Sequence, residues 1–165
     1  MDAIVYQSNA GHTERYAELL CAASGLPAYS LKAAKLPAGS QVIYMGWLMG
    51  GGISGLKKAR ARFDIKAVCA VGMSRDNEKQ NADIKTQNAL GELPYFYLQG
   101  GYESAKLRGL YAFMMKMMEK GAGKGLSEKA DRTPDEDDLL DMLQNGGDRV
   151  DEKNLAGVLE WLRTQ

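Results

Sequence analysis

The chain contains 165 residues, of which 45% are hydrophobic, and its 21 basic and 21 acidic side chains cancel at neutral pH. Residues 1–165 are therefore expected to form a single domain with a core of ordinary size, without an overall field that attracts nucleic acid. Two cysteines and one histidine are too few for a disulfide framework or a histidine-rich metal site. No run approaches the roughly 18 apolar residues of a membrane-spanning helix, and a strand pattern begins almost at Met1 in place of a leader, so the predicted location is cytoplasmic.

The chain contains five short β-rich runs, at 3–7, 28–31, 41–45, 67–71 and 95–98, which alternate with helical patterns. The first, third and fourth runs are almost continuously apolar, which is typical of strands covered on both faces. Apolar side chains recur at helical spacing after the first and third runs, and the polar stretch after the fourth run is predicted to be a loop followed by a helix. This alternation predicts a parallel sheet between two layers of helices.

The chain after the fifth run is predicted to form helices separated by one loop. Apolar side chains, many of them methionines, recur at helical spacing over 107–118. The glycine-rich, charged stretch 121–132 is expected to be a mobile loop. A capping box at 133–136, with proline at the first helical position, opens the next helix, which is expected to stop near Gly146. A final helix is predicted to start at Asp151.

The turn after the first run carries the strongest functional signal. It consists of Ser8, Asn9, Ala10, Gly11, His12 and Thr13. A turn between a strand and a helix can hold a phosphate, because the first helical turn offers N–H groups and the positive end of the helix dipole. Ser8 and Thr13 would add hydroxyl donors, and Gly11 would let the backbone approach the ligand. The alternative is an ordinary strand-to-helix turn with Thr13 as the N-cap.

These features together resemble the flavodoxin family, which has a Ser/Thr-rich turn after the first strand and glycine-rich turns after the third and fourth. The resemblance covers almost the whole chain and implies an α/β, flavodoxin-like three-layer sandwich with a five-stranded parallel sheet in the order 2-1-3-4-5. It also implies that FMN binds at the carboxyl ends of the strands, with its phosphate in the turn 8–13. Ala10 departs from the family pattern, which normally has a hydroxyl there, so one phosphate hydrogen bond would be missing. His12 fills a variable position and is expected to lie exposed near the phosphate.

Two further turns are implied by the resemblance to hold the flavin ring. In the turn 46–55, after the third run, the expected contacts are Trp47, Leu48, Met49 and Gly50. Trp47 either stacks on the ring or packs beside the sheet. After the fourth run the expected contacts are Gly72, Met73 and Ser74, and the aromatic residue that is usual in the family is missing from this turn. Tyr102, after the fifth run, either lies near the same mouth or serves only in packing.

Within the family the chain is most similar to the flavodoxin-domain branch that contains the menaquinone-dependent protoporphyrinogen oxidases. The likeness lies in the methionine-rich basic helix 106–118 and in a C-terminal helix that follows a charged connection. Phe113 and Met117 make the first of these helices apolar over a wide arc, which suits either peripheral contact with a membrane, quinone or partner, or irregular core packing. A basic run after the glycine turn would attract an anionic substrate, a membrane surface or an acidic redox partner, or else form a solvated helix face; it consists of Lys57, Lys58, Arg60 and Arg62.

These observations predict an FMN-binding flavoprotein in redox chemistry, in which the flavin carries the electrons and no side chain is needed as a catalytic acid or base. Zero net charge and the basic helix favour a flavodoxin-like oxidoreductase acting on a small molecule such as a quinone or a porphyrinogen, because flavodoxin carriers are usually strongly acidic. Two alternatives stay open. One is an electron-transfer flavodoxin, and the other is a flavin-free binding or regulatory module on the same fold, for which Ala10 and the missing aromatic residue are the evidence.

Overall fold

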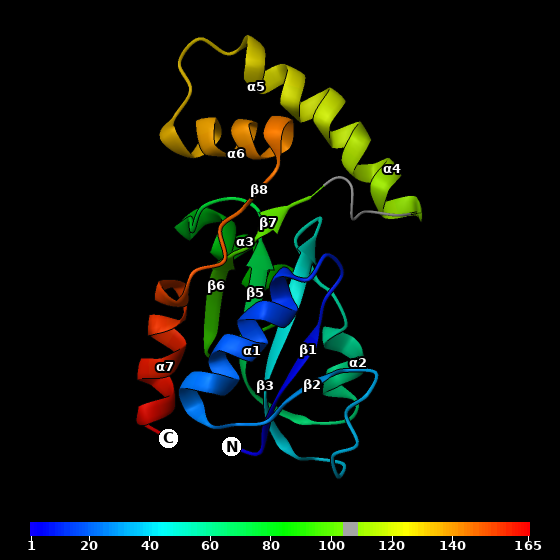
Figure 1. The fold of residues 1–165 in the computed structure, drawn as a ribbon, viewed down its shortest axis with the longest axis vertical. Coiled ribbons are helices and arrows are strands. Elements are labelled where there is room, and N and C mark those ends of the chain that lie inside the picture. Colours follow the sequence, from blue (N-terminus) through cyan, green and yellow to red (C-terminus); the bar gives the residue numbers. More distant parts are fainter. Residues whose placement is uncertain (104–108) are drawn as a thin grey trace.

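The computed structural model describes residues 1–103 and 109–165, and its centre is a twisted parallel sheet (Figure 1). Its strands are β1 (Ala3–Gln7), β2 (Ala28–Ser30), β3 (Gln41–Met49), β5 (Asp64–Gly72) and β6 (Tyr95–Gln99). They lie in the spatial order β2-β1-β3-β5-β6, and each pairs in parallel with its neighbours. This is the order 2-1-3-4-5 that the flavodoxin resemblance implies, so the predicted fold class is confirmed.

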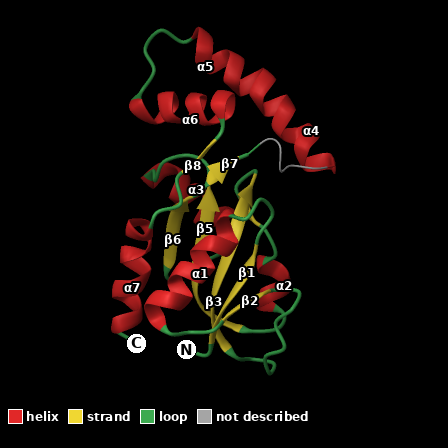
Figure 2. Cartoon of the chain, viewed as in Figure 1, coloured by secondary structure: helices red, strands yellow, loops and turns green. Residues whose placement is uncertain are grey.

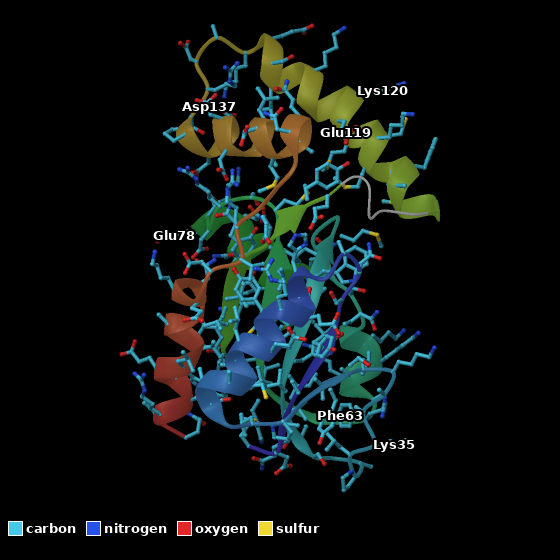
Figure 3. All side chains as sticks on the ribbon, in the orientation of Figure 1. Lys35, Phe63, Glu78, Glu119, Lys120 and Asp137 are labelled. Carbon is cyan, nitrogen blue, oxygen red and sulfur yellow. The ribbon has the colours of Figure 1, made fainter. Side chains whose placement is uncertain are left out.

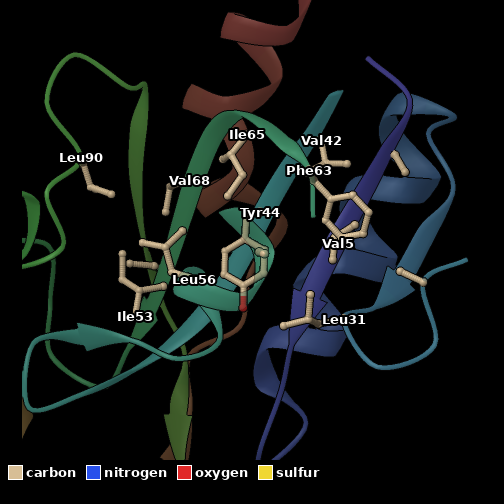
Figure 4. Close-up of a cluster of buried hydrophobic side chains, with 14 of the residues drawn as sticks. Val5, Leu31, Val42, Tyr44, Ile53, Leu56, Phe63, Ile65, Val68 and Leu90 are labelled. Carbon is tan, nitrogen blue, oxygen red and sulfur yellow. The ribbon is translucent and has the colours of Figure 1, made fainter. Parts of the chain in front are cut away.

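Helices cover both faces of the sheet because neighbouring strand residues point to opposite sides. One face packs against α1 (His12–Ser24) and α7 (Ala156–Arg163), with Tyr16, Leu20 and Val158 in the shared core. The other face packs against α2 (Leu56–Arg60) and α3 (Glu78–Gln87). Figure 4 shows the second core, in which Tyr44 of β3 lies among the apolar side chains of α2 and the strands.

The strand β3 continues four residues beyond the predicted run and forms a hairpin, which corrects the expectation of a turn over 46–55. Leu48 and Met49 pair antiparallel with β4 (Gly52–Ile53), and only Gly50 and Gly51, at φ +55° and +80°, form the turn. Gly46 therefore lies inside a strand. A Cβ there would lie 2.6 Å from the Ile53 side chain, so glycine at this position lets β4 pack closely against β3.

A separate group of helices follows the sheet between two short antiparallel strands, β7 (Gly101–Tyr102) and β8 (Gly147–Asp148). The group consists of α4 (Gly109–Met118), a π-helical turn (Glu119–Gly123), α5 (Lys124–Glu128) and α6 (Pro134–Asn145). We call it the helical cap. It lies beyond the carboxyl ends of the strands, outside both helical layers of the sandwich (Figure 2), and its core contains Met115, Met142 and Leu143 together with Tyr102.

The stretch 121–132 is helical as far as Glu128, whereas a loop was expected there. Its glycines have low helix propensity, but Lys124 pairs with Glu128 across one helical turn at 3.7 Å, and α5 packs against α6. The chain leaves the helix only at Lys129, whose carbonyl accepts a 2.9 Å hydrogen bond from Arg132. Of the methionine-rich motif quoted above, positions 106–108 lie outside the described residues.

The predicted helix signals near the C-terminus are confirmed. The Thr133 hydroxyl accepts a hydrogen bond from the Glu136 amide at 3.3 Å, and the Glu136 carboxylate accepts one from the Thr133 amide at 2.9 Å. The helix ends at Asn145, with Gly146 as its C-cap. Asp151 caps a 3₁₀ turn, Glu152–Leu155, which leads directly into α7. None of the helices in the two described ranges is long and apolar enough to cross a membrane.

Candidate functional site

The loop between β1 and α1 leaves the first helical turn without a capping side chain. The helix starts at His12 and its N-cap is Gly11, at φ +100°, which has no side chain to offer. Thr13 is therefore not the N-cap that the alternative interpretation expected, and the choice between a phosphate turn and an ordinary strand-to-helix turn stays a prediction. Because an uncapped first turn presents its amides to whatever lies in front of it, this end of α1 is suited to an anion.

Ser8 shapes this loop from within. Its hydroxyl oxygen accepts a hydrogen bond from the Gly11 amide at 3.2 Å, which closes the turn. A hydroxyl has one hydrogen to donate and two lone pairs, so this bond does not use the Ser8 hydrogen. Ser8 can therefore hold the loop and donate to an anion with the same group.

His12 is buried, with only 6% of its surface exposed, which corrects the expectation of an exposed side chain. Its Nε2 atom lies 3.6 Å from the Glu103 carboxylate. It also fills the space above Gly101, where a Cβ would come within 2.5 Å of Nε2. The burial results from β7, which folds back over the start of α1 from a distant part of the sequence.

A cavity of about 700 Å³ lies at the carboxyl ends of the central strands and reaches the cap. Its size falls in the range of sites that hold a cofactor or a drug-sized ligand. Most of the residues predicted to bind a cofactor line it: Asn9, Ala10, His12, Thr13, Trp47, Leu48, Met49, Gly50, Gly72, Met73 and Ser74. Three segments that are distant in sequence therefore meet around one space.

Three predicted residues do not line this cavity. Ser8 and Gly11 belong to the same loop and determine its shape through the hydrogen bond between the Gly11 amide and the Ser8 hydroxyl. Tyr102 is buried in the core of the cap, with 4% of its surface exposed, and its hydroxyl donates to the Glu119 carboxylate. Tyr102 thus serves the packing of the cap, the second of the two roles considered for it.

The hairpin that carries Trp47 is fixed by the end of α3. The Asn88 side chain accepts from the Ile53 amide and donates to the Gly51 carbonyl, both at 2.8 Å, much as a neighbouring strand would. Gln87 donates to the Gly50 carbonyl at 2.9 Å. The half-buried Trp47 pairs with Val71 of β5 in the sheet and lines the cavity, so it is held on a rigid element.

The turn after β5 is also held by internal hydrogen bonds. The Tyr97 hydroxyl donates to the Ser74 carbonyl at 2.7 Å, and the Ser74 hydroxyl donates to the Gln80 carboxamide at 2.9 Å. Burial raises the pKa of Tyr97 to about 12, although its hydrogen bonds with Ser74 and Gln80 act in the opposite direction. Tyr97 therefore stays protonated at neutral pH. A side chain at Gly72 would collide with its hydroxyl, so the turn requires glycine there.

The cavity has two walls that the sequence analysis missed. One is polar and belongs to α3 and the residue before it: Asn77, Lys79, Gln80, Asp83 and Gln87. The other is apolar and belongs to the cap: Met114, Met115, Met118, Leu139 and Leu143. The first wall had a usable signal, because the helix that follows a parallel strand begins at the edge where ligands bind. The position of the second wall is set by the packing of the cap over the strand ends, and no local sequence pattern predicts that packing.

The basic run on and after α2 is partly structural. Arg60 donates to the Asn88 and Ala89 carbonyls, both at 2.9 Å. Arg62 donates to the Leu31 and Ala34 carbonyls at 2.7 and 2.6 Å. These guanidinium groups tie loops to the sandwich, and Lys57, Lys58, Arg60 and Arg62 are all exposed, as a solvated helix face requires.

The apolar arc of the methionine-rich helix is divided between two surroundings. Met115 is buried in the core of the cap. Phe113 and Met117 are 62% and 57% exposed. The helix thus contributes both to the cavity and to an exposed apolar surface.

No family model matches the chain, and no curated protein matches it. A solved structure to which the chain is similar is described as the flavodoxin, WrbA-like protein from Agrobacterium tumefaciens. The identity is 16%, the match covers 59% of this chain and 82% of the other, and the TM-score is 0.37. The strand order and the two helical layers described above define the fold independently of this likeness.

Proposed function

We propose that this chain is an FMN-binding flavoprotein that performs redox chemistry on a small molecule held in the cavity. The observation that carries the proposal is the convergence of the 8–13 loop, the Trp47 hairpin and the 72–74 turn on one space at the carboxyl edge of a parallel sheet. Open α/β sheets bind their ligands at this edge, next to the point where the strand order reverses. That point lies between β1 and β3, which carry the first two of these segments.

The residues of the 8–13 loop fit the phosphate of FMN, except that one hydrogen-bond donor is missing. The uncapped amides at the start of α1, the Ser8 hydroxyl and the side chain of Thr13 supply donors to an anion. Ala10 lines the cavity but has no hydroxyl to add. A hydrogen bond to a charged group contributes roughly 1.5 to 3 kcal/mol, so this loss weakens binding by about tenfold or more without abolishing it.

The ring of the flavin would lie between the hairpin and the turn after β5. Trp47 offers an aromatic face for stacking, and Gly50 and Gly72 let the backbone approach the ring edge. When bound, FMN supplies the electron-accepting group of the reaction. The protein orients the ring, and the apolar wall of the cap keeps water away from it.

An oxidoreductase acting on a small molecule is our preferred function. Met114, Met118 and Leu139 place an apolar wall over the cavity, and such a wall suits a quinone or a porphyrinogen, as the resemblance to menaquinone-dependent protoporphyrinogen oxidases implies. A cytoplasmic location belongs to the same proposal. An electron-transfer flavodoxin is the second candidate, and Ala10 together with the lack of an aromatic side chain in the 72–74 turn supports a flavin-free binding module as the third.

The experiment that tests the proposal is incubation of the purified protein with FMN, desalting, and an absorbance spectrum. We expect perturbed flavin bands at about one flavin per chain, and a colourless protein would refute flavin binding and favour the flavin-free module. Anaerobic reduction of the bound flavin then separates the other two functions. An oxidoreductase is reoxidised rapidly by a quinone in single-turnover measurements, whereas a carrier is reoxidised rapidly only by a protein partner.

A further inference from the structure

One attachment of the cap to the sandwich is the side chain of Asp138, in the second turn of α6. Only 9% of this side chain is exposed. Its Oδ2 atom accepts a 2.8 Å hydrogen bond from Nε2 of Gln99, the last residue of β6. Arg75 and Arg149 approach the same carboxylate at 3.6 and 3.7 Å.

These contacts differ in strength, and the bond from Gln99 is the strongest. Arg75 is about half exposed, and its ion pair with Asp138 is long, so solvent screens it. Arg149 is shared with Asp141, to which it is closer, at 3.2 Å. A short hydrogen bond between an amide and a nearly buried carboxylate is stronger than either of these long pairs.

Gln99 links Asp138 to the turn that is proposed to hold the flavin. Its Nε2 group donates a second hydrogen bond, at 3.2 Å, to the carbonyl of Met73. A primary amide has two hydrogens, and both are used here. The reverse orientation of the amide would direct its oxygen at two acceptors, so only this orientation satisfies the group.

Met73 is also connected to the cap through its side chain. It packs against the cap core, as does Leu139, which directly follows Asp138 in α6. Met73, Leu139 and Leu143 all line the cavity. The turn 72–74 and the wall formed by α6 are thus joined twice, once by hydrogen bonds through Gln99 and once by apolar packing.

We propose that Asp138 is a positioning residue which, through Gln99, holds the α6 wall and the 72–74 turn together, so that the cap stays closed over the flavin-binding turn. The part of this inference that concerns FMN rests on the proposed function: a cofactor seated on the turn leaves only when the cap lifts. The coupling between the cap and the turn does not depend on any ligand.

The test uses Asp138→Ala, with Asp138→Asn and Asp137→Ala as comparisons. Asp137 is the neighbouring residue on α6 (labelled in Figure 3) and pairs at 2.6 Å with Arg132, within the cap. Asn at 138 keeps an oxygen that can accept from Gln99, so it is expected to rescue part of the effect. Oxidation of methionines by dilute peroxide, located by mass spectrometry, reports the exposure of each methionine.

We expect Asp138→Ala to speed the oxidation of the fully buried Met142 by about tenfold or more and that of the partly exposed Met73 by a smaller factor, since local opening becomes easier when a charge-assisted hydrogen bond is lost. Met117, which is 57% exposed and does not line the cavity, serves as the internal standard and is expected to be unchanged. In Asp137→Ala, Met73 is expected to be oxidised at the wild-type rate. Faster oxidation of Met142 with Met73 unchanged overturns the proposal, because the contact between the cap and the 72–74 turn then stays closed without the Asp138–Gln99 hydrogen bond.

Gln99→Ala is the second variant, and it keeps the inference testable if Asp138→Ala does not fold. It removes the bridge without changing the cap, so oxidation of Met142 is expected to rise with that of Met73, and an unchanged rate at Met142 refutes the coupling. FMN release is measured in parallel and is expected to quicken in the same variants. If no variant or wild-type protein binds FMN, the proposed function fails while the oxidation pattern still decides the coupling.

Discussion

Replacement of Gly11 tests the phosphate site most directly, because two variants at this position add comparable backbone strain and differ in charge. Gly11 has φ +100°, and a Cβ added there meets nothing within 4 Å. Gly11→Ala therefore adds strain without a collision, and Gly11→Asp adds comparable strain together with a negative charge at the start of α1. The matched control is Gly25→Ala, at the other end of the same helix, where φ is +75° and a Cβ is equally unobstructed.

The magnitudes follow from this geometry. A non-glycine residue in such a conformation costs about 1 to 3 kcal/mol of folding stability, so both alanine variants are expected to be destabilised to a similar degree. In the free protein, a negative charge at a helix N-terminus increases the folding stability by about 0.3 to 1 kcal/mol. The same charge roughly 5 Å from a phosphate costs about 1 to 3 kcal/mol of binding, which is about 5- to 150-fold in the dissociation constant.

Two assays separate these effects. Urea unfolding of the free protein is expected to rank Gly11→Asp as more stable than Gly11→Ala. Quenching of FMN fluorescence on titration is expected to give the opposite order, with Gly11→Asp binding FMN more weakly than Gly11→Ala and Gly25→Ala binding like the wild type. Equal FMN affinities for the two Gly11 variants would refute the placement of the phosphate at this helix terminus.

Three other changes are expected to act on the lining of the cavity or on the stability of the cap. Trp47→Leu keeps the strand but removes the aromatic face. The free energy of FMN binding, measured by titration, is expected to weaken by about 0.5 to 1.5 kcal/mol, which is the contribution of a stacked aromatic pair. An unchanged affinity assigns Trp47 to packing alone. Gly101→Ala places a Cβ against the Gly147 carbonyl of β8 and 2.5 Å from Nε2 of His12, and such overpacking is expected to cost about 1 to 3 kcal/mol in thermal unfolding and to loosen the cap. Hydrogen bonds from the Lys129 ammonium group and the Thr133 amide lower the pKa of the Glu136 carboxyl. The ionised carboxylate therefore stabilises α6 at pH values above the usual carboxyl range, and this stabilisation is lost as the pH falls through the lowered pKa. Glu136→Gln is expected to remove that part of the acid sensitivity, measured by circular dichroism between neutral and acidic pH, and an unchanged acid transition contradicts this assignment.

Local signals predicted individual elements correctly where short-range chemistry decides the structure. The capping box of Thr133 and Glu136 is contained in four consecutive residues, and its hydrogen bonds form as the sequence predicts. The run 3–7 is apolar enough for a buried central strand, and β1 has the same bounds. The order of the strands required the resemblance to a known family, because no local pattern specifies which strands become neighbours.

The errors at the site have a common cause, which is contact with chain that is far away in sequence. His12 looks like a polar residue in an exposed turn, and only the return of β7 buries it against Glu103. Gly46 looks like the start of a turn, but the pairing of β3 with β4 extends the strand past it. The glycines of 121–128 look like a loop, and packing of α5 on α6 keeps them helical. In each case a tertiary contact overrides a local preference.

The position of the cap bears on whether the chain is an enzyme or a carrier. A carrier passes electrons to a protein that must approach the flavin edge, and its docking surface is therefore expected to lie open. Here Met114, Met118 and Leu139 cover that edge of the cavity with apolar side chains, and the zero net charge offers a protein partner no strong steering field. An apolar wall next to the proposed ring site benefits a small substrate instead, because it removes water and contacts the substrate directly. The cap thus favours a reaction inside the cavity, and the coupling through Asp138 would make access of that substrate depend on the same movement that releases the cofactor.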